Sequence, residues 1–76
     1  MSFKAMGWAT SVKTGSPTKK LILLLLADRA NNEGFCWPSM KTLVEDCEMS
    51  REAISRNIKQ MAEANLLHVT KHANKD

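Results

Sequence analysis

The chain contains an unbroken run of seven apolar residues, Leu21 to Ala27, within a sequence of only 76 residues. Ser16 and Pro17 precede the run and form a usual helix start, because serine caps helices and proline fits the first helical position. A helix that is apolar at every position cannot keep one whole face in water. We therefore predict a helix over residues 17–31 that is covered on more than one side and forms the centre of the core.

This apolar run also limits the class of protein. It is much shorter than the ~18 residues that a membrane helix needs, and the first four residues lack the order of a signal peptide. We therefore expect a cytoplasmic protein without a membrane partner. A domain of this size buries only about 60% of the surface of its unfolded chain, which leaves little room for an enclosed active site. We expect no enzyme.

The cysteines and histidines do not form a recognisable metal site. Cys36 and Cys47 have no C-x-x-C partner, and His68 and His72 form only a lone H-x-x-x-H pair. Free cysteine is commonly a small buried hydrophobe, so we predict that both cysteines are buried and that both histidines lie on the surface. No metal, cofactor or catalytic residue is expected.

Two shorter helices are predicted after a turn that includes Gly34, which can adopt a positive φ. Ser39 is a good N-cap for a helix over residues 40–47, and Ser50 for one over residues 51–64. Asn65 can take the left-handed position that ends the last helix. Apolar residues recur with helical spacing in both segments: Met40, Leu43, Val44 and Cys47, then Ile54, Ile58, Met61 and Ala62. The sequence thus predicts a mainly α domain.

The two ends of the chain are less defined. Residues 1–16 are interrupted by Gly7 and could form a strand, a small helix or an extended arm. Residues 68–76 begin with weak alternation of apolar and polar side chains, as in a strand, but no second strand follows as its partner. We treat the first segment as an N-terminal arm and the last as a tail.

The second and third predicted helices have the outline of a helix-turn-helix, because a turn of about three residues joins them. Ile54 and Ile58 set the inward direction of the third helix, and Asn57 could contact DNA if it faces outward. Arginine can read guanine, and the amides at serine-capped helix starts favour phosphate. An ordinary three-helix bundle with a solvated face remains the alternative. The outward residues are Arg51, Glu52, Ser55, Arg56 and Lys59.

Positive charge gathers at the two ends of the chain. Residues 1–20 carry four lysines and no acid, residues 21–48 carry two bases and five acids, and residues 49–76 carry five bases and three acids. Such asymmetry suits a protein that turns one face toward a polyanion. Lysines outside the third helix could then supply phosphate contacts. These are Lys4, Lys13, Lys19, Lys20 and Lys71.

The stretch from Lys20 to Leu67 resembles the winged helix-turn-helix domains at the N-termini of bacteriophage and prophage replication proteins. This group includes the O-type initiators and related small bacterial regulators. The most specific segments are "LADRAN", "GFCWPS" and "MSREAISRNI". The resemblance implies a three-helix winged helix-turn-helix core over residues 17–67, with a truncated or incomplete wing that begins at residue 68.

The resemblance also implies a role for individual residues. The recognition helix falls on residues 51–64, where Arg51, Glu52, Ser55, Arg56 and Lys59 are the candidate DNA contacts, with Ser50 as the cap. The start of the second helix would contact phosphate through Ser39, Lys41 and Thr42, whereas Trp37 either joins them or fills the core. The implied core positions are Leu21 to Leu26, Leu43, Ile54, Ile58 and Leu66.

The function implied is sequence-specific binding of double-stranded DNA in a bacterial or phage-infected cell. We expect the origin-binding N-terminal domain of a phage-type replication initiator, which binds DNA as a homodimer. Other replication proteins would bind a C-terminal region beyond Asp76. One alternative is a transcriptional regulator with the same fold. Another is a protein-interaction module that does not bind DNA and docks a partner through Phe3, Met6 and Trp8.

Overall fold

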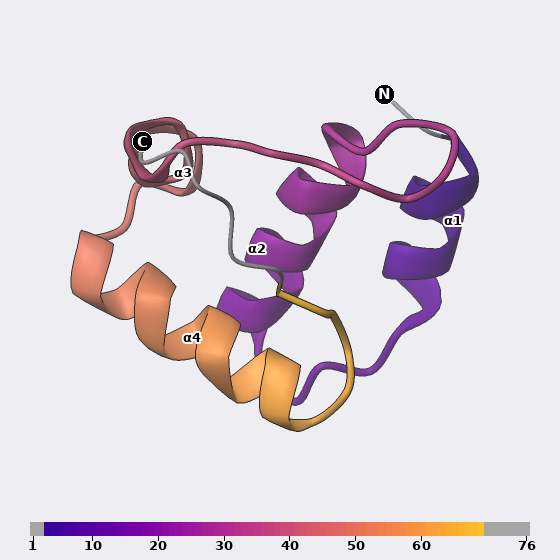
Figure 1. Cartoon of the computed structure of the whole chain (residues 1–76). Helices are drawn as coiled ribbons and strands as arrows, with labels where there is room; N and C mark the ends of the chain where they lie inside the picture. Colours follow the sequence, from indigo (N-terminus) through magenta and orange to yellow (C-terminus); the bar gives the residue numbers. More distant parts are fainter. Residues whose placement is uncertain (1–2, 70–76) are drawn as a thin grey trace.

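The computed structural model describes residues 3–69, and four helices and no strand are found in that part of the chain. They are α1 (Phe3–Ser11), α2 (Pro17–Asp28), α3 (Met40–Cys47) and α4 (Arg51–Glu63) (Figure 1). The predicted mainly α class is confirmed. The number of helices differs from the predicted three, because the N-terminal segment also folds into a helix.

Helix α2 is the centre of the domain, as the unbroken apolar run predicts. It packs against α1, α3 and α4, and its Ile22 and Leu23 are buried. Coverage from three sides explains why apolar residues are tolerated around most of the helix. Leu21 is an exception to the predicted core, because 41% of it is exposed.

Helix α2 ends at Asp28, three residues before its predicted end at residue 31. The amides of Arg29 and Ala30 bond to the carbonyls of Leu26 and Ala27, three residues earlier, at 3.2 Å each. These short-range bonds tighten the last turn and stop the α-helix.

The chain then reverses around Asn31. Its side-chain oxygen accepts hydrogen bonds from the amides of Glu33 and Phe35, at 2.9 and 3.0 Å. Gly34 has a φ of 87° within this turn, as predicted. An asparagine side chain that bonds amides ahead of it commonly stabilises a turn. This turn leads the chain across to α3 (Figure 1).

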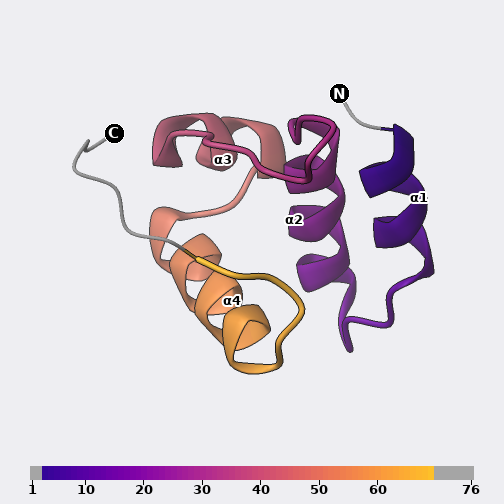
Figure 2. The same cartoon turned by 45° about the vertical axis from the view of Figure 1, so that its right-hand side comes forward.

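The N-terminal segment is part of the folded domain and does not form an extended arm. Helix α1 lies beside α2 (Figure 2), and its Ala9 is fully buried. At the C-terminal end of α1, Nζ of Lys20 donates hydrogen bonds to the carbonyl oxygens of Thr10 and Val12, at 2.7 and 2.6 Å. Two of the three N–H groups of this amine therefore bind carbonyl oxygens, and a phosphate contact by Lys20 stays a prediction.

The helix caps follow the sequence prediction. Ser16, Ser39 and Ser50 each accept a hydrogen bond from the backbone amide three residues later, at 3.0 to 3.1 Å. Asn65 has a φ of 63° after α4, which is the left-handed position predicted for it. The capping serines therefore fix where α2, α3 and α4 begin. The left-handed backbone of Asn65 follows the end of α4 at Glu63, one residue before the predicted end at residue 64.

A salt bridge connects the end of α2 to α3. The Arg29 guanidinium binds the Asp46 carboxylate, with Nε 3.2 Å from Oδ2. Hydrogen bonding to Asp46 raises the pKa of Arg29 above its ordinary value. The bridge is exposed to solvent, so it contributes little to the stability of the domain.

The cysteines differ from each other. Cys47 is buried in the core, as predicted, whereas Cys36 is only half-buried, so its predicted burial is wrong. Cys36 lies in the connection before α3, outside any helix. Burial raises the pKa of both thiols.

The predicted wing strand is not found in the part of it that the structure describes. His68 and Val69 are exposed and belong to no strand. Residues 70–76, which include Lys71 and His72, lie outside the described residues. Within residues 3–69, no helix is long and apolar enough to cross a membrane.

Candidate nucleic-acid interface

A tight turn joins helices α3 and α4. Three residues separate them, and the first, Glu48, has a left-handed backbone with φ 56° and ψ 44°. Its amide donates to the carbonyl of Val44 at 3.0 Å, which closes the end of α3. Met49 then packs against the core, and Ser50 caps α4. This is the backbone arrangement of a helix-turn-helix, with α4 in the position of the recognition helix.

Helix α4 has one buried face and one exposed face. Ile54, Asn57 and Met61 point into the domain. The five outward residues predicted from the sequence, Arg51, Glu52, Ser55, Arg56 and Lys59, are all exposed. Their contact with DNA stays a prediction, but the fold brings them together on one accessible helix face.

Two further exposed residues of α4 were missed from the sequence, and both lie beyond the five residues predicted to contact DNA. Gln60 and Glu63 are exposed on α4. Gln60 follows Arg56 by four residues and Glu63 follows Lys59 by four, so the helical period alone could have identified both. The exposed face is therefore longer than predicted and carries a second acid at its C-terminal end.

Asn57 does not belong to this face. It is only 8% exposed, and its Nδ2 donates to the carbonyl oxygen of Ala53 at 2.7 Å. The side-chain amide of Asn57 thus bonds to a carbonyl one turn earlier in the same helix, and the side chain points into the domain. The prediction that Asn57 contacts DNA depended on an outward orientation, which the structure excludes.

The start of α3 offers one accessible cation beside two half-buried hydroxyls. Lys41 is exposed, whereas Ser39 and Thr42 are half-buried and bound to each other. The Ser39 hydroxyl donates to Oγ1 of Thr42 at 3.0 Å and accepts from the Thr42 amide at 3.1 Å. Lys41 is therefore the residue of this group with the freest reach toward a phosphate, and the two hydroxyls mainly build the cap.

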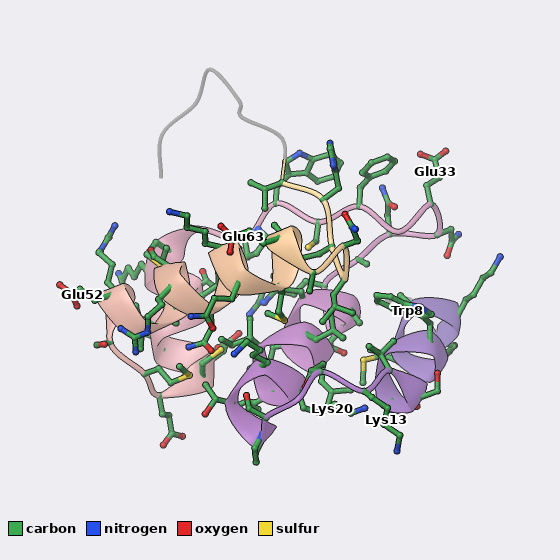
Figure 3. The ribbon with its side chains drawn as sticks, turned by 90° about the horizontal axis from the view of Figure 1, so that it is seen from below. Trp8, Lys13, Lys20, Glu33, Glu52 and Glu63 are labelled. Carbon is green, nitrogen blue, oxygen red and sulfur yellow. The ribbon has the colours of Figure 1, made fainter. Side chains whose placement is uncertain are left out.

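The remaining lysines within residues 3–69 are spread over the domain. Lys4 and Lys13 are exposed, and Lys19 is half-buried. Figure 3 places Lys13 and Lys20 beside α1, on the other side of the domain from Glu52. Lys13 and Lys20 therefore do not form a continuous patch with the beginning of α4.

An apolar hollow adjoins the exposed face of α4. Its lining includes Ser55 and Lys59 of α4, Trp8 of α1 and the connection before α3. In that connection Phe35 stacks on Trp37, with ring centroids 6.2 Å apart. Trp37 is 64% exposed, so the interpretation that it fills the core is wrong.

Comparison with known proteins matches the same part of the chain. A protein-family model described as a helix-turn-helix domain matches residues 16–67. The matched span contains α2, α3, α4 and the turn at Glu48, and it leaves α1 outside. Neither the curated proteins nor the solved structures contain a match to this chain.

Proposed function

This chain belongs to the helix-turn-helix domain family, and from that premise we propose that it binds double-stranded DNA sequence-specifically, with α4 in the major groove. One observation supports the proposal most directly. Arg51, Ser55, Arg56 and Lys59 share the exposed face of the helix whose opposite face is buried in the core. Arginine suits guanine, and serine suits base edges or phosphate.

Phosphate contacts would position this helix on the duplex. Lys41 projects from the start of α3, where backbone amides also favour an anion. Lys59 lies one turn beyond Ser55 on α4 and can reach a second phosphate or a base. Such contacts provide affinity without reading sequence, so a few of them are enough to place the reading residues.

Within DNA binding, we propose the origin-recognition domain of a phage-type replication initiator. The support is the resemblance of the segments around Leu26 and Ser50 to such domains. A transcriptional regulator would place the same helix in the same groove and would differ in what is attached to it. The proposed complex is a homodimer on two half-sites about 34 Å apart, with other replication proteins bound through a region beyond Asp76.

Selection of bound sequences from a random duplex pool tests this function. We expect enrichment of one motif, repeated at the spacing of one helical turn if the protein binds as a dimer. The selected duplex should lose affinity steeply as salt rises, because phosphate contacts release counterions. Absence of any enriched sequence would overturn specific binding, and one protein per complete site would overturn the dimer.

A protein-interaction module is the second candidate, and one observation favours it. Phe3 and Trp8 of α1 are 84% and 49% exposed, which leaves apolar surface for a partner. Met6, the third residue of that predicted surface, instead packs partly against the core. Docking through apolar side chains should depend little on salt, so the salt slope separates the two candidates.

A further inference from the structure

Glu52 occupies the most outward position in the first turn of α4. It precedes the fully buried Met61 by nine residues, which is about two and a half turns, so the two side chains leave the helix in opposite directions. Figure 3 shows Glu52 pointing away from the domain at the beginning of α4. A helix that enters a groove with its N-terminal residues foremost would thus present a carboxylate to the bases.

Among the residues that the structure describes, no base pairs with the Glu52 carboxylate. Arg56 follows it by four residues, a spacing at which acid and base can pair on a helix surface. Within residues 3–69, however, Glu52 joins no salt bridge and no side-chain hydrogen bond. Its oxygens are therefore free to accept hydrogen bonds from a ligand, and Arg56 is free to donate its own.

A free carboxylate has few favourable partners on DNA. The phosphates repel it, guanine and thymine present acceptors at their major-groove edges, and adenine presents the N7 acceptor beside its N6 amino group. Cytosine presents the N4 amino group as its hydrogen-bond group in that groove, and glutamate can accept from it. An acid at this position therefore adds nothing to general affinity and favours cytosine over bases that offer acceptors.

We infer that Glu52 is a specificity-determining residue that accepts a hydrogen bond from N4 of a cytosine in the target site. The inference rests on the proposed DNA binding by α4. Arg56 lies about 6 Å further along the helix axis, close to the rise of two base pairs, and it is the natural partner for a nearby guanine. Each half-site should then contain a cytosine and a guanine within a few base pairs.

The test compares sites selected by the wild type, Glu52→Gln, Glu52→Ala and Glu63→Gln. Glu63 is a matched control, since it is an exposed acid eleven residues along α4, close to the same side of the helix but three turns from its beginning. The wild type should prefer cytosine at one position by about 5- to 150-fold. Glu52→Ala should abolish that preference, Glu52→Gln should shift it toward adenine, and Glu63→Gln should leave it unchanged.

Several results would overturn the inference. The first is the same cytosine preference in the wild type and in Glu52→Ala. The second is tighter binding of both Glu52 variants to every duplex with an unchanged motif, which would mean that Glu52 only repels DNA. The third is a lower melting temperature of the Glu52 variants with an unchanged motif. That result would mean that Glu52 only stabilises α4, through the helix dipole. If the wild type itself enriches no motif, the proposed function fails and the inference fails with it.

Discussion

The amine of Lys20 lies 2.6 Å from the carbonyl oxygen of Val12, and it reaches a second carbonyl, that of Thr10, at 2.7 Å. Thr10 belongs to the last turn of α1, where backbone carbonyls lack partners within the helix. A cation there also interacts favourably with the helix dipole. One side chain of α2 thus fastens the end of α1 to the central helix.

Replacement of Lys20 should therefore weaken the whole domain. Lys20→Met keeps much of the aliphatic chain but removes the donors, and we expect the free energy of unfolding to fall by about 1.5–3 kcal/mol, the range for charged hydrogen bonds. The exposed Lys13 is the control, and Lys13→Met should change the free energy of unfolding by less than about 0.5 kcal/mol. Urea denaturation measures both, and equal losses would contradict the role given to Lys20.

The turn between α3 and α4 should be improved by glycine. Glu48 holds a left-handed backbone that costs a residue with a Cβ about 1–2 kcal/mol, and its side chain is exposed. Glycine adopts the left-handed backbone without this cost, although it loses more conformational entropy on folding. The net effect of Glu48→Gly should be to raise the free energy of unfolding by about 1 kcal/mol. Glu45→Gly, in the interior of α3, should lower it by about 1 kcal/mol. Thermal melts of the two variants should shift in opposite directions.

Arg56 should read sequence, whereas Gln60, one turn later, should not. Arg56→Ala is expected to weaken binding to the selected duplex by about 1–3 kcal/mol and to relax the preference at one base pair. Gln60 lies further from the beginning of α4, so we expect Gln60→Ala to change the binding free energy by less than about 0.5 kcal/mol. Fluorescence anisotropy titrations at one fixed salt concentration compare the variants. Wild-type affinity for Arg56→Ala would remove this residue from the reading face.

The two thiols should react at different rates. Burial raises the pKa of both, so less thiolate is present at neutral pH than in an unfolded peptide, and alkylation should need a higher pH in the folded protein. Cys36 is half-buried and Cys47 is only 4% exposed, so Cys36 should be modified first. Mass spectrometry after brief iodoacetamide treatment measures the order. Cys36→Ser is the control, because its remaining thiol, Cys47, should react only once the protein unfolds. Earlier modification of Cys47 would contradict the packing of α3.

The boundaries of α3 and α4 could be predicted from the sequence because they depend on groups only a few residues apart. Ser39 and Ser50 accept the amides three residues ahead, and Asn65 closes the last helix by its own backbone conformation. The exposed face of α4 follows from the same local period, which is why its first five members could be predicted from the sequence.

The sequence by itself therefore determined the helix starts, the helix-turn-helix and the outward face of α4. Only the tertiary structure decided the rest. Residues 3–11 contain a glycine and a mixture of apolar and polar side chains, and this segment becomes α1 where Ala9 can be buried against α2. Lys20 bonds carbonyls eight and ten residues earlier, and Trp37 is exposed although its aromatic ring suits a core. Caps and helical period act within one or two turns, whereas these features depend on which surfaces of the folded chain meet.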